Sequence, residues 1–377
     1  MNNERPRIAV ICTEYRPLSH ADVIVSRWLE PFPTDHLYGW TQPASQIVSI
    51  YAEQRHNQKD LIPASVARHG LQCFPSIEKA LTLGGDSLAV DGILLIAEHG
   101  DYPENELGQK LYPRKEFFDA IMAVFEAAGR SVPIFFDKHL SWNPEWIREM
   151  SDRVAKSRIP FFAGSSIPFS LPESLTDLPR GSKFDEVVAI YYTGLESYLF
   201  HSAELVESVI AGRFSEQEGI SEIVAWKDEE VWQAVDRGDF SWELVEAACA
   251  SASPEALEAI QRLRRDRDGG PVYAFRLRYD DGFYVTHFMQ TDVVKHWCLA
   301  ARLDGGQNIA AGSPDVGGAA HFFPHFARLC VKIDEFFISG RSPIPTDRIY
   351  RTSMTTALCL RALQAPGRRL STPELSL

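Results

Sequence analysis

The sequence lacks the features that define several classes of protein. Its six cysteines lie far apart and no two form a Cys-x-x-Cys pair, which excludes a disulfide framework and a thiolate zinc site. No apolar run approaches the roughly 18 residues that a membrane span needs, and the polar start of the chain does not resemble a signal peptide. We therefore expect a cytoplasmic protein that does not associate with membranes.

Positive charge is also scarce. The chain has 38 Lys and Arg against 51 Asp and Glu, which gives a formal net charge of −13. Such a surface repels the phosphate backbone of nucleic acids, so we expect a small-molecule substrate and no nucleic-acid partner. The chain has 377 residues, of which 45% are hydrophobic. That length is too great for one core, and the composition is typical of a globular protein, so two domains are expected.

Short runs of apolar, β-branched residues alternate with helical patterns in the first part of the chain. Predicted strands cover residues 7–12, 46–51, 73–74, 90–97, 132–136 and 159–163, and predicted helices cover 76–81, 115–128 and 144–156. This alternation is typical of a parallel, doubly wound sheet. We therefore predict an α/β fold whose first domain, residues 1–165, is Rossmann-like.

The pattern changes after residue 165. Strands are predicted at 186–192, 271–279 and 283–288, and the hairpin signal Asp280-Asp-Gly282 joins the last two. Hairpin connections favour an open, mainly antiparallel sheet. Residues 166–377 are thus predicted to form a C-terminal α+β domain, with its final helices free to pack back on the first domain.

Four segments carry a family resemblance through their order along the chain. They are the strand Val90–Ala97, the strand end Phe136-Asp-Lys-His139 with Leu140, the helix segment Tyr198-Leu-Phe-His201 with Glu204, and a tail made of Phe326–Gly340, Pro343–Ala357 and Gly367-Arg-Arg-Leu370. Together they resemble the Gfo/Idh/MocA family of glucose-fructose oxidoreductases and inositol dehydrogenases. The resemblance implies that the C-terminal domain binds substrate and forms a homo-oligomer through its sheet. It also implies a lysine beside the substrate at Lys138 and a histidine in the catalytic position at His201.

One family feature is missing, namely the glycine fingerprint that follows the first strand. Three glycines there normally allow a tight turn and a close approach of the backbone to a dinucleotide diphosphate. In this sequence they are replaced by Cys12, Glu14 and Pro17. A carboxylate repels the diphosphate, and proline lacks an N–H to bind it. The sequence therefore predicts a divergent member that does not bind NAD(P) in the usual way, and it identifies no cofactor-binding residue.

Ionisable residues follow the ends of several predicted strands, where ligands bind in open α/β sheets. His20 follows the first strand, Glu98 and His99 follow the fourth, and His139 follows the fifth. The resemblance brings the helix of His201 to the same cleft. Imidazole and carboxylate are the usual ligands of zinc, manganese and iron. The predicted ligands of a divalent metal are His20, Glu98, His99, His139 and His201, and the predicted catalytic residues are Lys138, His139 and His201.

A further histidine pair, His321 and His325, has the i, i+4 spacing that binds metals on helices. Pro324 lies between the two histidines and is expected to interrupt any helix there. We therefore leave this pair out of the predicted site.

The segment Gly100–Pro113 is longer than the turn that the family has at this point. Loops of this length inside compact domains are often lids or binding loops. Its side chains are expected at the mouth of the cleft, where they would clamp a carboxylate or a hydroxyl-rich substrate. The predicted substrate-binding residues are Tyr102, Lys110, Tyr112, Arg114 and, on the later helix, Glu204.

Three functions compete on these grounds. The first interpretation is a metal-assisted, non-redox lyase, isomerase or hydrolase of a small sugar-, polyol- or keto-acid-like substrate, in which Lys138 stabilises developing negative charge. The first alternative is an NAD(P)-dependent oxidoreductase of a sugar or polyol with atypical cofactor binding. The second alternative is a non-catalytic binding protein on the same fold. The missing glycines favour the first interpretation over the oxidoreductase, and the dense polar cluster argues against the binding protein.

Overall fold

The structure is a computed structural model that describes residues 5–33, 40–55, 59–170, 181–192, 194–211, 219–303, 306, 308–312 and 323–376. The chain divides into two compact units. Unit 1 is Met1–Asn105, Lys110–Ser166 and Gly317–Tyr350, and unit 2 is Glu106–Gln109, Ile167–Val316 and Arg351–Leu377. The expected division into domains at residues 1–165 and 166–377 stays a prediction.

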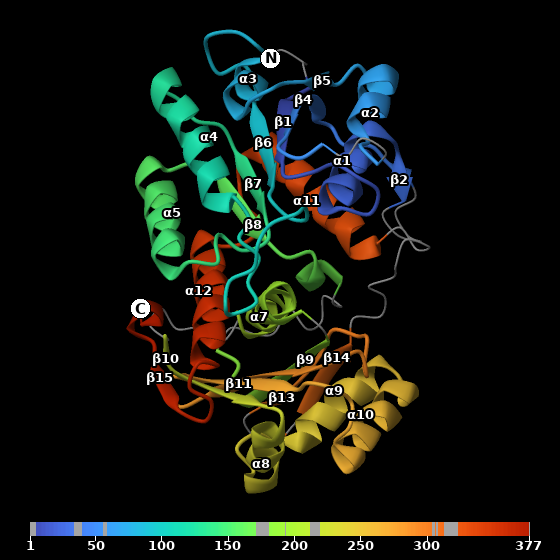
Figure 1. The fold of residues 1–377 in the computed structure, drawn as a ribbon, viewed down its shortest axis with the longest axis vertical. Helices are drawn as coiled ribbons and strands as arrows, with labels where there is room; N and C mark the ends of the chain where they lie inside the picture. Colours follow the sequence, from blue (N-terminus) through green and yellow to red (C-terminus); the bar gives the residue numbers. More distant parts are fainter. Residues whose placement is uncertain are drawn as a thin grey trace. The chain divides into compact units, whose positions relative to one another are not determined.

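Unit 1 is built on a six-stranded parallel sheet (Figure 1). Its strands in spatial order are β5 (Gln72–Cys73), β4 (Gln46–Ala52), β1 (Arg7–Cys12), β6 (Gly92–Ile96), β7 (Ile134–Asp137) and β8 (Phe161–Gly164). The chain reverses its direction of travel across the sheet between β1 and β6, which are hydrogen-bonded neighbours. This is the strand order of a Rossmann fold, and ligands of such sheets bind at the carboxyl ends of the strands near the reversal.

Helices of unit 1 begin and end at residues with clear capping roles. They are α1 (His20–Leu29), α2 (Ile62–His69), α3 (Ile77–Thr82), α4 (Arg114–Ala128), α5 (Pro144–Ser157) and α11 (Pro324–Ser339). Ser19 caps α1 by accepting a hydrogen bond from the backbone N–H of Asp22, and Asn143 caps α5 in the same way. Gly129 ends α4 in the left-handed conformation that glycine adopts without strain. A short hairpin of β2 (Phe32–Pro33) and β3 (Trp40–Thr41) follows α1.

Helix α11 corrects one prediction from the sequence. Pro324 does not interrupt a helix; it occupies the first turn of α11, where its missing N–H costs no hydrogen bond. The Phe336 ring of this helix packs 5.8 Å from that of Phe162 on β8. His325 lies in α11, whereas His321 is outside the described residues.

Unit 2 contains a seven-stranded mixed sheet. Its strands in spatial order are β14 (Asn308–Gly312), β13 (Cys298–Leu303), β9 (Phe184–Tyr192), β12 (Tyr284–Gln290), β11 (Tyr273–Tyr279), β10 (Ile220–Lys227) and β15 (Arg369–Ser371). Strands β9 and β12 pair in parallel, and the other neighbouring strands pair antiparallel. The predicted fold class, a parallel doubly wound sheet followed by a mainly antiparallel one, is confirmed.

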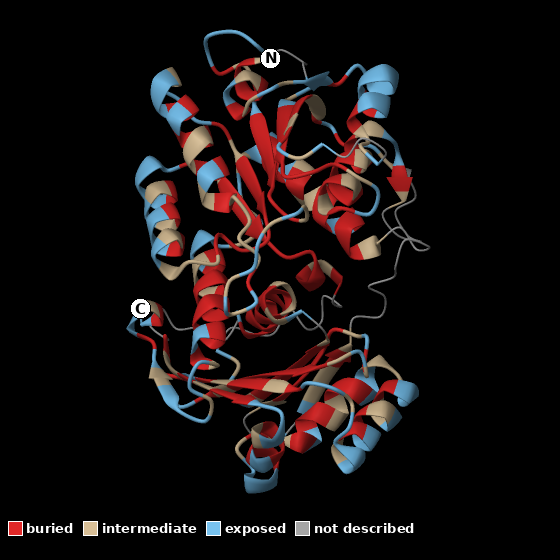
Figure 2. Ribbon diagram, in the orientation of Figure 1, coloured by how far each residue is buried: buried red, intermediate tan, exposed pale blue. Residues whose placement is uncertain are grey.

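Helices cover both faces of this second sheet. They are α7 (Leu195–Ile210), α8 (Glu229–Arg237), α9 (Trp242–Ala252) and α10 (Pro254–Asp266), with short 3-10 turns η1 (Ile167–Ser170) and η3 (Pro373–Leu375). Helix α12 (Thr346–Ala362) begins in unit 1 and belongs to unit 2 from Arg351 onward. Val188 and Ile190 of β9 share a core with Trp232 of α8 and Trp242 of α9. On the other face, Ser202 of α7 is hydrogen-bonded to His287 of β12. Buried residues therefore line both sheets (Figure 2).

Candidate functional site

The loops that follow β1, β6 and β7 bring a polar cluster together at the carboxyl edge of the unit 1 sheet. Four of its members are almost completely buried, namely Glu98, Asp137, Lys138 and His139, each with at most 5% of its surface exposed. Buried charges are rare unless they are paired, and they concentrate at functional sites. This edge is therefore the candidate site of unit 1.

His20 is the first residue of α1 and links the loops after β1, β6 and β7. Its Nδ1 lies 2.6 Å from Oδ2 of Asp137, and its backbone N–H donates to Nδ1 of His99 across 3.3 Å. The Phe326 ring of α11 packs edge-on against the His20 imidazole at 4.9 Å. Asp137 thus fixes the orientation of the His20 imidazole, as the carboxylate of a catalytic triad does for its histidine.

His99 is held in the neutral form. Burial, together with the nearby His20, lowers its pKa from 6.5 to about 4. Because Nδ1 accepts a hydrogen bond from the backbone of His20, the ring proton of the neutral imidazole lies on Nε2. His99 is therefore a hydrogen-bond donor at neutral pH.

Glu98 forms the centre of a second group. Its Oε2 lies 2.5 Å from Nη2 of Arg114, and its Oε1 lies 3.5 Å from Nζ of Lys138. Burial alone would raise the pKa of Glu98, but the two cations lower it well below its ordinary value, so the side chain is a carboxylate. Arg114 also donates from Nη1 to Nε2 of His139 at 2.8 Å, which makes His139 a neutral acceptor.

Two residues of this cluster have strained backbones. His99 has φ 71° and Lys138 has φ 73°, both in the left-handed region that non-glycine residues rarely adopt. The backbone N–H of Lys138 donates to the carbonyl of Gly164 at the end of β8, which holds the strained turn in place. Strain of this kind costs about 1–3 kcal/mol per residue and is retained mostly where function requires the geometry.

The turn after β1 contains Glu14 and Pro17, which replace two glycines of the family fingerprint. Glu14 is 1% exposed, and its Oε1 lies 2.6 Å from Nε of Arg16. Arg16 therefore neutralises the carboxylate that occupies the place of a glycine. Pro17 contributes no N–H to the turn.

Backbone N–H groups of the same turn are mostly used inside the protein. The N–H of Arg16 donates to the Ser19 hydroxyl at 3.3 Å, and that of Leu18 donates to the Asp22 carboxylate at 2.8 Å. The N–H of Ser19 donates to the carbonyl of Arg16, and that of His20 is taken up by His99. The turn therefore offers few free N–H groups to a diphosphate.

The end of β4 is tied to the loop that follows β6. Gln54 exchanges two hydrogen bonds with the backbone of Asp101, at 2.8 and 3.1 Å. Glu53, the residue directly after β4, accepts a hydrogen bond from the Tyr102 hydroxyl, and the pKa of that hydroxyl is raised by burial and by Glu53. An acidic residue at the end of the second strand is the group that binds the adenosine ribose in Rossmann folds.

Solved structures with the same architecture cover nearly the whole chain. The myo-inositol 2-dehydrogenase of Lactobacillus plantarum aligns over 98% of this chain and 99% of its own, with a TM-score of 0.59 and 12% identity. The myo-inositol dehydrogenase of Lactobacillus casei, solved with NAD(H) and myo-inositol, aligns over 98% and 97%, with a TM-score of 0.60 and 12% identity. A probable dehydrogenase of Thermotoga maritima aligns over 98% of this chain and 99% of its own, with a TM-score of 0.60 and 12% identity. The chain has the fold of the Gfo/Idh/MocA family. The resemblance predicted from the sequence is thus confirmed for the fold.

Comparisons of sequence do not extend this result. No protein-family model matches the chain, and no curated protein matches it either. None of the helices in the described part of the chain combines the length and the apolar character of a membrane span. The similarity to known proteins therefore lies in the fold alone.

A nicotinamide cofactor fits part of this Gfo/Idh/MocA-fold site. The turn after β1 does not fit a diphosphate held in the glycine-rich manner, because Glu14 is buried there and most N–H groups are already used. Glu53 is exposed at the position that binds ribose in Rossmann folds. The guanidinium of Arg16 is already paired with Glu14, so it offsets the repulsion between that carboxylate and a diphosphate but adds no net positive charge to the turn. The residues present thus fit a cofactor whose ribose is bound by Glu53 and whose diphosphate is not held in the glycine-rich manner.

The predicted metal-assisted, non-redox function is wrong. Among the described residues, no group of three or more His, Cys, Asp or Glu side chains is arranged to hold a metal ion. Glu98 and His139 share the guanidinium of Arg114, a cation that repels a metal, and His20 is paired with Asp137. The solved structures with this fold are inositol and related dehydrogenases, which favours the oxidoreductase alternative.

The predicted substrate-binding residues in and directly after the Gly100–Pro113 segment contact other groups of the protein. The rings of Tyr102 and Tyr112 pack edge-on at 5.4 Å, and Lys110 forms a 2.8 Å ion pair with Glu104. Arg114 is 1% exposed and lies over the Tyr112 ring, so its guanidinium is committed to the interior of unit 1. Substrate binding by these residues stays a prediction, and for Arg114 the contacts indicate a positioning role.

His201 and Glu204 belong to α7 in unit 2, and both are buried. The imidazole of His201 packs edge-on against Trp297 at 5.3 Å and lies near Tyr198. Tyr198 in turn stacks on Trp297 at 5.3 Å. The catalytic role of His201 and the binding role of Glu204 stay predictions.

Two residues of interest were missed or undervalued from the sequence. Glu53 was overlooked although it directly follows the predicted strand 46–51, where a carboxylate has a known place in Rossmann folds. Asp137 was left out of the site because it replaces a glutamate of the Gfo/Idh/MocA family that often has a structural role. Its 2.6 Å contact with His20 depends on a neighbour 117 residues away, which the sequence pattern does not reveal.

Proposed function

We propose that the protein is an oxidoreductase of a small sugar- or polyol-like alcohol that uses a nicotinamide cofactor held in an atypical way. The observation that carries the proposal is Lys138 at the end of β7, buried and held by Glu98 at the reversal edge of a Gfo/Idh/MocA fold. The solved dehydrogenases with this fold support it. Binding of the cofactor is atypical because the turn after β1 has Glu14, Arg16 and Pro17 in place of a glycine-rich sequence.

Oxidation of an alcohol needs the removal of a proton from the hydroxyl and of a hydride from its carbon. A nicotinamide supplies the hydride acceptor. The Lys138 ammonium stabilises the alkoxide that forms as the proton leaves. His20, oriented by Asp137, is the proposed base, and His99 donates a hydrogen bond from Nε2 to the substrate oxygen. His139, predicted to be catalytic, is here a positioning residue that accepts from Arg114.

Lys138→Met tests the proposed role of the ammonium. Loss of the charge that stabilises the alkoxide is expected to lower kcat/KM about 10²- to 10⁴-fold, the range typical of such groups. The matched control is Lys156→Met, an exposed residue near the end of α5, which is expected to leave kcat/KM unchanged. A Lys138→Met variant as active as the wild type would remove Lys138 from the mechanism.

The function itself is tested by following the absorbance of NADH or NADPH with a panel of cyclitols, hexoses and sugar acids. We expect at least one substrate to give turnover with NAD(P)⁺, and the His20→Ala variant to lose at least 100-fold of that rate. Turnover that is unaffected by His20→Ala would contradict the proposed base. No turnover with any member of the panel, in either direction of the reaction, would contradict the oxidoreductase proposal.

A second function is favoured by one observation. The N–H groups of Arg16, Leu18, Ser19 and His20 are used inside unit 1, which is the state expected of a fold that has lost its cofactor. The alternative is thus a non-catalytic binding protein for the same class of small polar ligand. It predicts saturable binding of a sugar or polyol without NAD(P) binding, whereas the oxidoreductase proposal requires both.

A further inference from the structure

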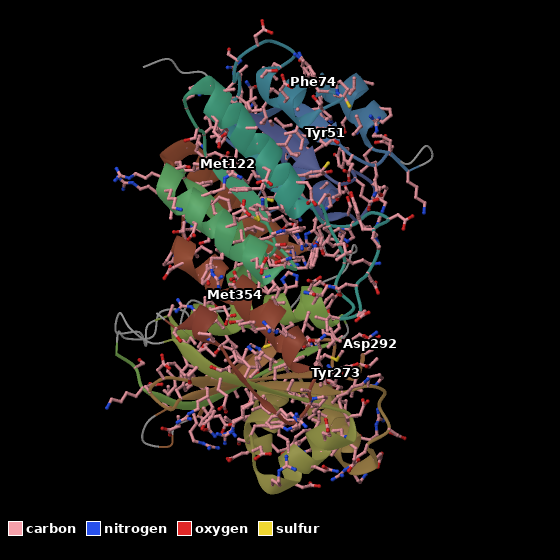
Figure 3. All side chains as sticks on the ribbon, turned by 60° about the vertical axis from the view of Figure 1, so that its left-hand side comes forward. Tyr51, Phe74, Met122, Tyr273, Asp292 and Met354 are labelled. Carbon is pink, nitrogen blue, oxygen red and sulfur yellow. The ribbon has the colours of Figure 1, made fainter. Side chains whose placement is uncertain are left out.

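Two consecutive residues after β4 bind two consecutive residues of the loop after β6. Gln54 accepts a hydrogen bond from the backbone N–H of Asp101 at 2.8 Å and donates to its carbonyl at 3.1 Å. The Tyr102 hydroxyl donates to Oε2 of Glu53. Tyr51, labelled in Figure 3, marks the end of β4 from which Glu53 and Gln54 extend. All of these residues belong to unit 1, so the contact holds two loops of one unit together.

The Tyr102 side chain is held in place from two sides. Its ring packs edge-on against that of Tyr112 at 5.4 Å. Gly100 lies so close that a Cβ there would come 2.7 Å from Cε2 of the Tyr102 ring and 3.0 Å from Oε1 of Gln54. Gly100 also has φ 105°, which glycine adopts without strain. Burial and the bond to Glu53 raise the pKa of the Tyr102 hydroxyl, so it stays protonated. It is therefore a fixed hydrogen-bond donor.

Glu53 is bonded through one oxygen of its carboxylate. Among the residues that the structure describes, its side chain has a hydrogen bond with Tyr102 alone, and that bond uses Oε2. A carboxylate accepts hydrogen bonds on both of its oxygens. The side chain is exposed, so Oε1 is available to a ligand at the position that binds ribose in Rossmann folds.

The cation nearest to Glu53 in the sequence is bound to other groups. Arg55, two residues further on, pairs through Nε with Oδ2 of Asp60 and donates from Nη1 to Sγ of Cys73 at 3.4 Å. In Rossmann folds that bind NADP, an arginine near this position binds the 2′-phosphate. Because Asp60 already balances the charge of Arg55, the negative charge of Glu53 is left in force at this position.

We propose that Tyr102 is a positioning residue that makes the protein specific for NAD(H) over NADP(H), an inference that rests on the proposed function. The Tyr102 hydroxyl fixes the Glu53 carboxylate so that Oε1 accepts hydrogen bonds from the ribose hydroxyls of NAD(H). The same bond prevents the carboxylate from turning away from the 2′-phosphate of NADP(H), so the two negative charges repel each other. Tyr102 thus acts on the cofactor through Glu53.

The experiment is a titration of the full chain with NADH and with NADPH, for the wild type and Tyr102→Phe. We expect the wild type to bind NADH at least about tenfold more tightly than NADPH, because the 2′-phosphate faces a fixed carboxylate. Tyr102→Phe retains the ring and its packing on Tyr112 but releases Glu53. It is expected to weaken NADH binding about threefold or more and to reduce the preference for NADH by a similar factor.

The matched control is Tyr273→Phe, at a tyrosine of β11 in unit 2 that Figure 3 also labels. It is expected to change neither affinity. Glu53→Gln gives a second test that leaves the tyrosine in place. It removes the charge and retains an acceptor, so it is expected to abolish the preference for NADH. A preference that persists in Glu53→Gln would overturn the proposal.

A double-mutant cycle tests whether Tyr102 acts through Glu53. In a Glu53→Ala background, Tyr102→Phe is expected to change neither affinity, because its partner is absent. Equal weakening of both cofactors by Tyr102→Phe in either background would show a purely structural role and overturn the proposal. Tighter NADH binding by Tyr102→Phe would overturn it too, since the hydroxyl would then block the ribose.

Failure of this inference differs from failure of the proposed function. A folded wild type that binds NADPH as tightly as NADH contradicts the role of Tyr102 and leaves the oxidoreductase proposal in place. A folded wild type that binds neither cofactor contradicts both.

Discussion

The Arg114→Met variant is expected to lose about 3–5 kcal/mol of unfolding free energy at pH 7, because it leaves one partner of a buried ion pair without its counter-charge. Arg114 is 1% exposed and donates to both Glu98 and His139. Without the guanidinium, the Glu98 carboxylate retains only the 3.5 Å contact with Lys138. The measurement is urea unfolding of variant and wild type.

Two controls separate the ion pair from the loss of packing. Arg148→Met changes an exposed arginine of α5 and is expected to shift stability by less than about 0.5 kcal/mol. Adding Glu98→Gln to Arg114→Met removes the buried charge and should recover at least about 1 kcal/mol, since the two side chains are coupled. An Arg114→Met variant within about 1 kcal/mol of the wild type would show that this pair does not hold the site together.

Acidification is expected to lower the free energy of unfolding already at pH values above those at which carboxylates titrate. Burial lowers the pKa of His99 to about 4, and the pKa values of His287 and His325 to about 3 each, from 6.5. A histidine whose folded pKa is lowered binds its proton more readily in the unfolded chain. Its contribution is therefore intact above pH 6.5 and is lost as the pH falls toward the folded value.

Each of these histidines contributes a slope of up to about 1.4 kcal/mol per pH unit between roughly pH 6 and pH 4.5. The unfolding free energy, measured by urea titration at several pH values, should thus fall steeply in that window. His287→Gln is expected to lower this slope, because it removes one of the three histidines that take up a proton on unfolding. An unfolding free energy that does not change between pH 7 and pH 5 would contradict the neutral state of the three side chains.

Much of the fold follows from local patterns in the sequence. The run Arg7–Cys12 is apolar, β-branched and bounded by polar residues, and it forms β1 with the predicted ends. Helix α4 differs from its predicted range by one residue because its apolar spacing and the capping Gly129 are local signals. The regular alternation of strands and helices was enough to predict the parallel sheet of unit 1.

Helices α8, α9 and α10 were not predicted, although their caps are visible in the sequence. Ser241 and Ser253 each precede a helix and accept from its first turn, and Pro254 occupies the first position of α10. Their apolar faces are short and interrupted by charged residues, so periodicity alone was a weak signal. Pro324 was misread for a related reason, because a proline starts a helix as readily as it ends one.

The location of the candidate site could be predicted from the sequence, but the contacts between its side chains could not. Strand topology predicts that four side chains reach the same edge of the sheet, and the structure places all of them in unit 1. They are His20, Glu98, His99 and His139. Which groups they contact depends on Arg114 and Asp137, whose side chains turn inward for reasons of tertiary packing. The metal prediction was wrong because side chains at the same edge of the sheet were assumed to bind the same metal ion.

Binding of a nicotinamide cofactor without a glycine-rich turn is tested by titrating NADH and NADPH into the protein. We expect saturable binding of at least one of them, with a Kd of roughly 10 μM to 1 mM because the turn offers few free N–H groups. We also expect at least tenfold weaker binding by Glu53→Ala, and unchanged binding by Glu78→Ala, which removes an exposed carboxylate of α3. The absence of saturable binding of either cofactor at millimolar concentration, with the protein folded, would contradict it.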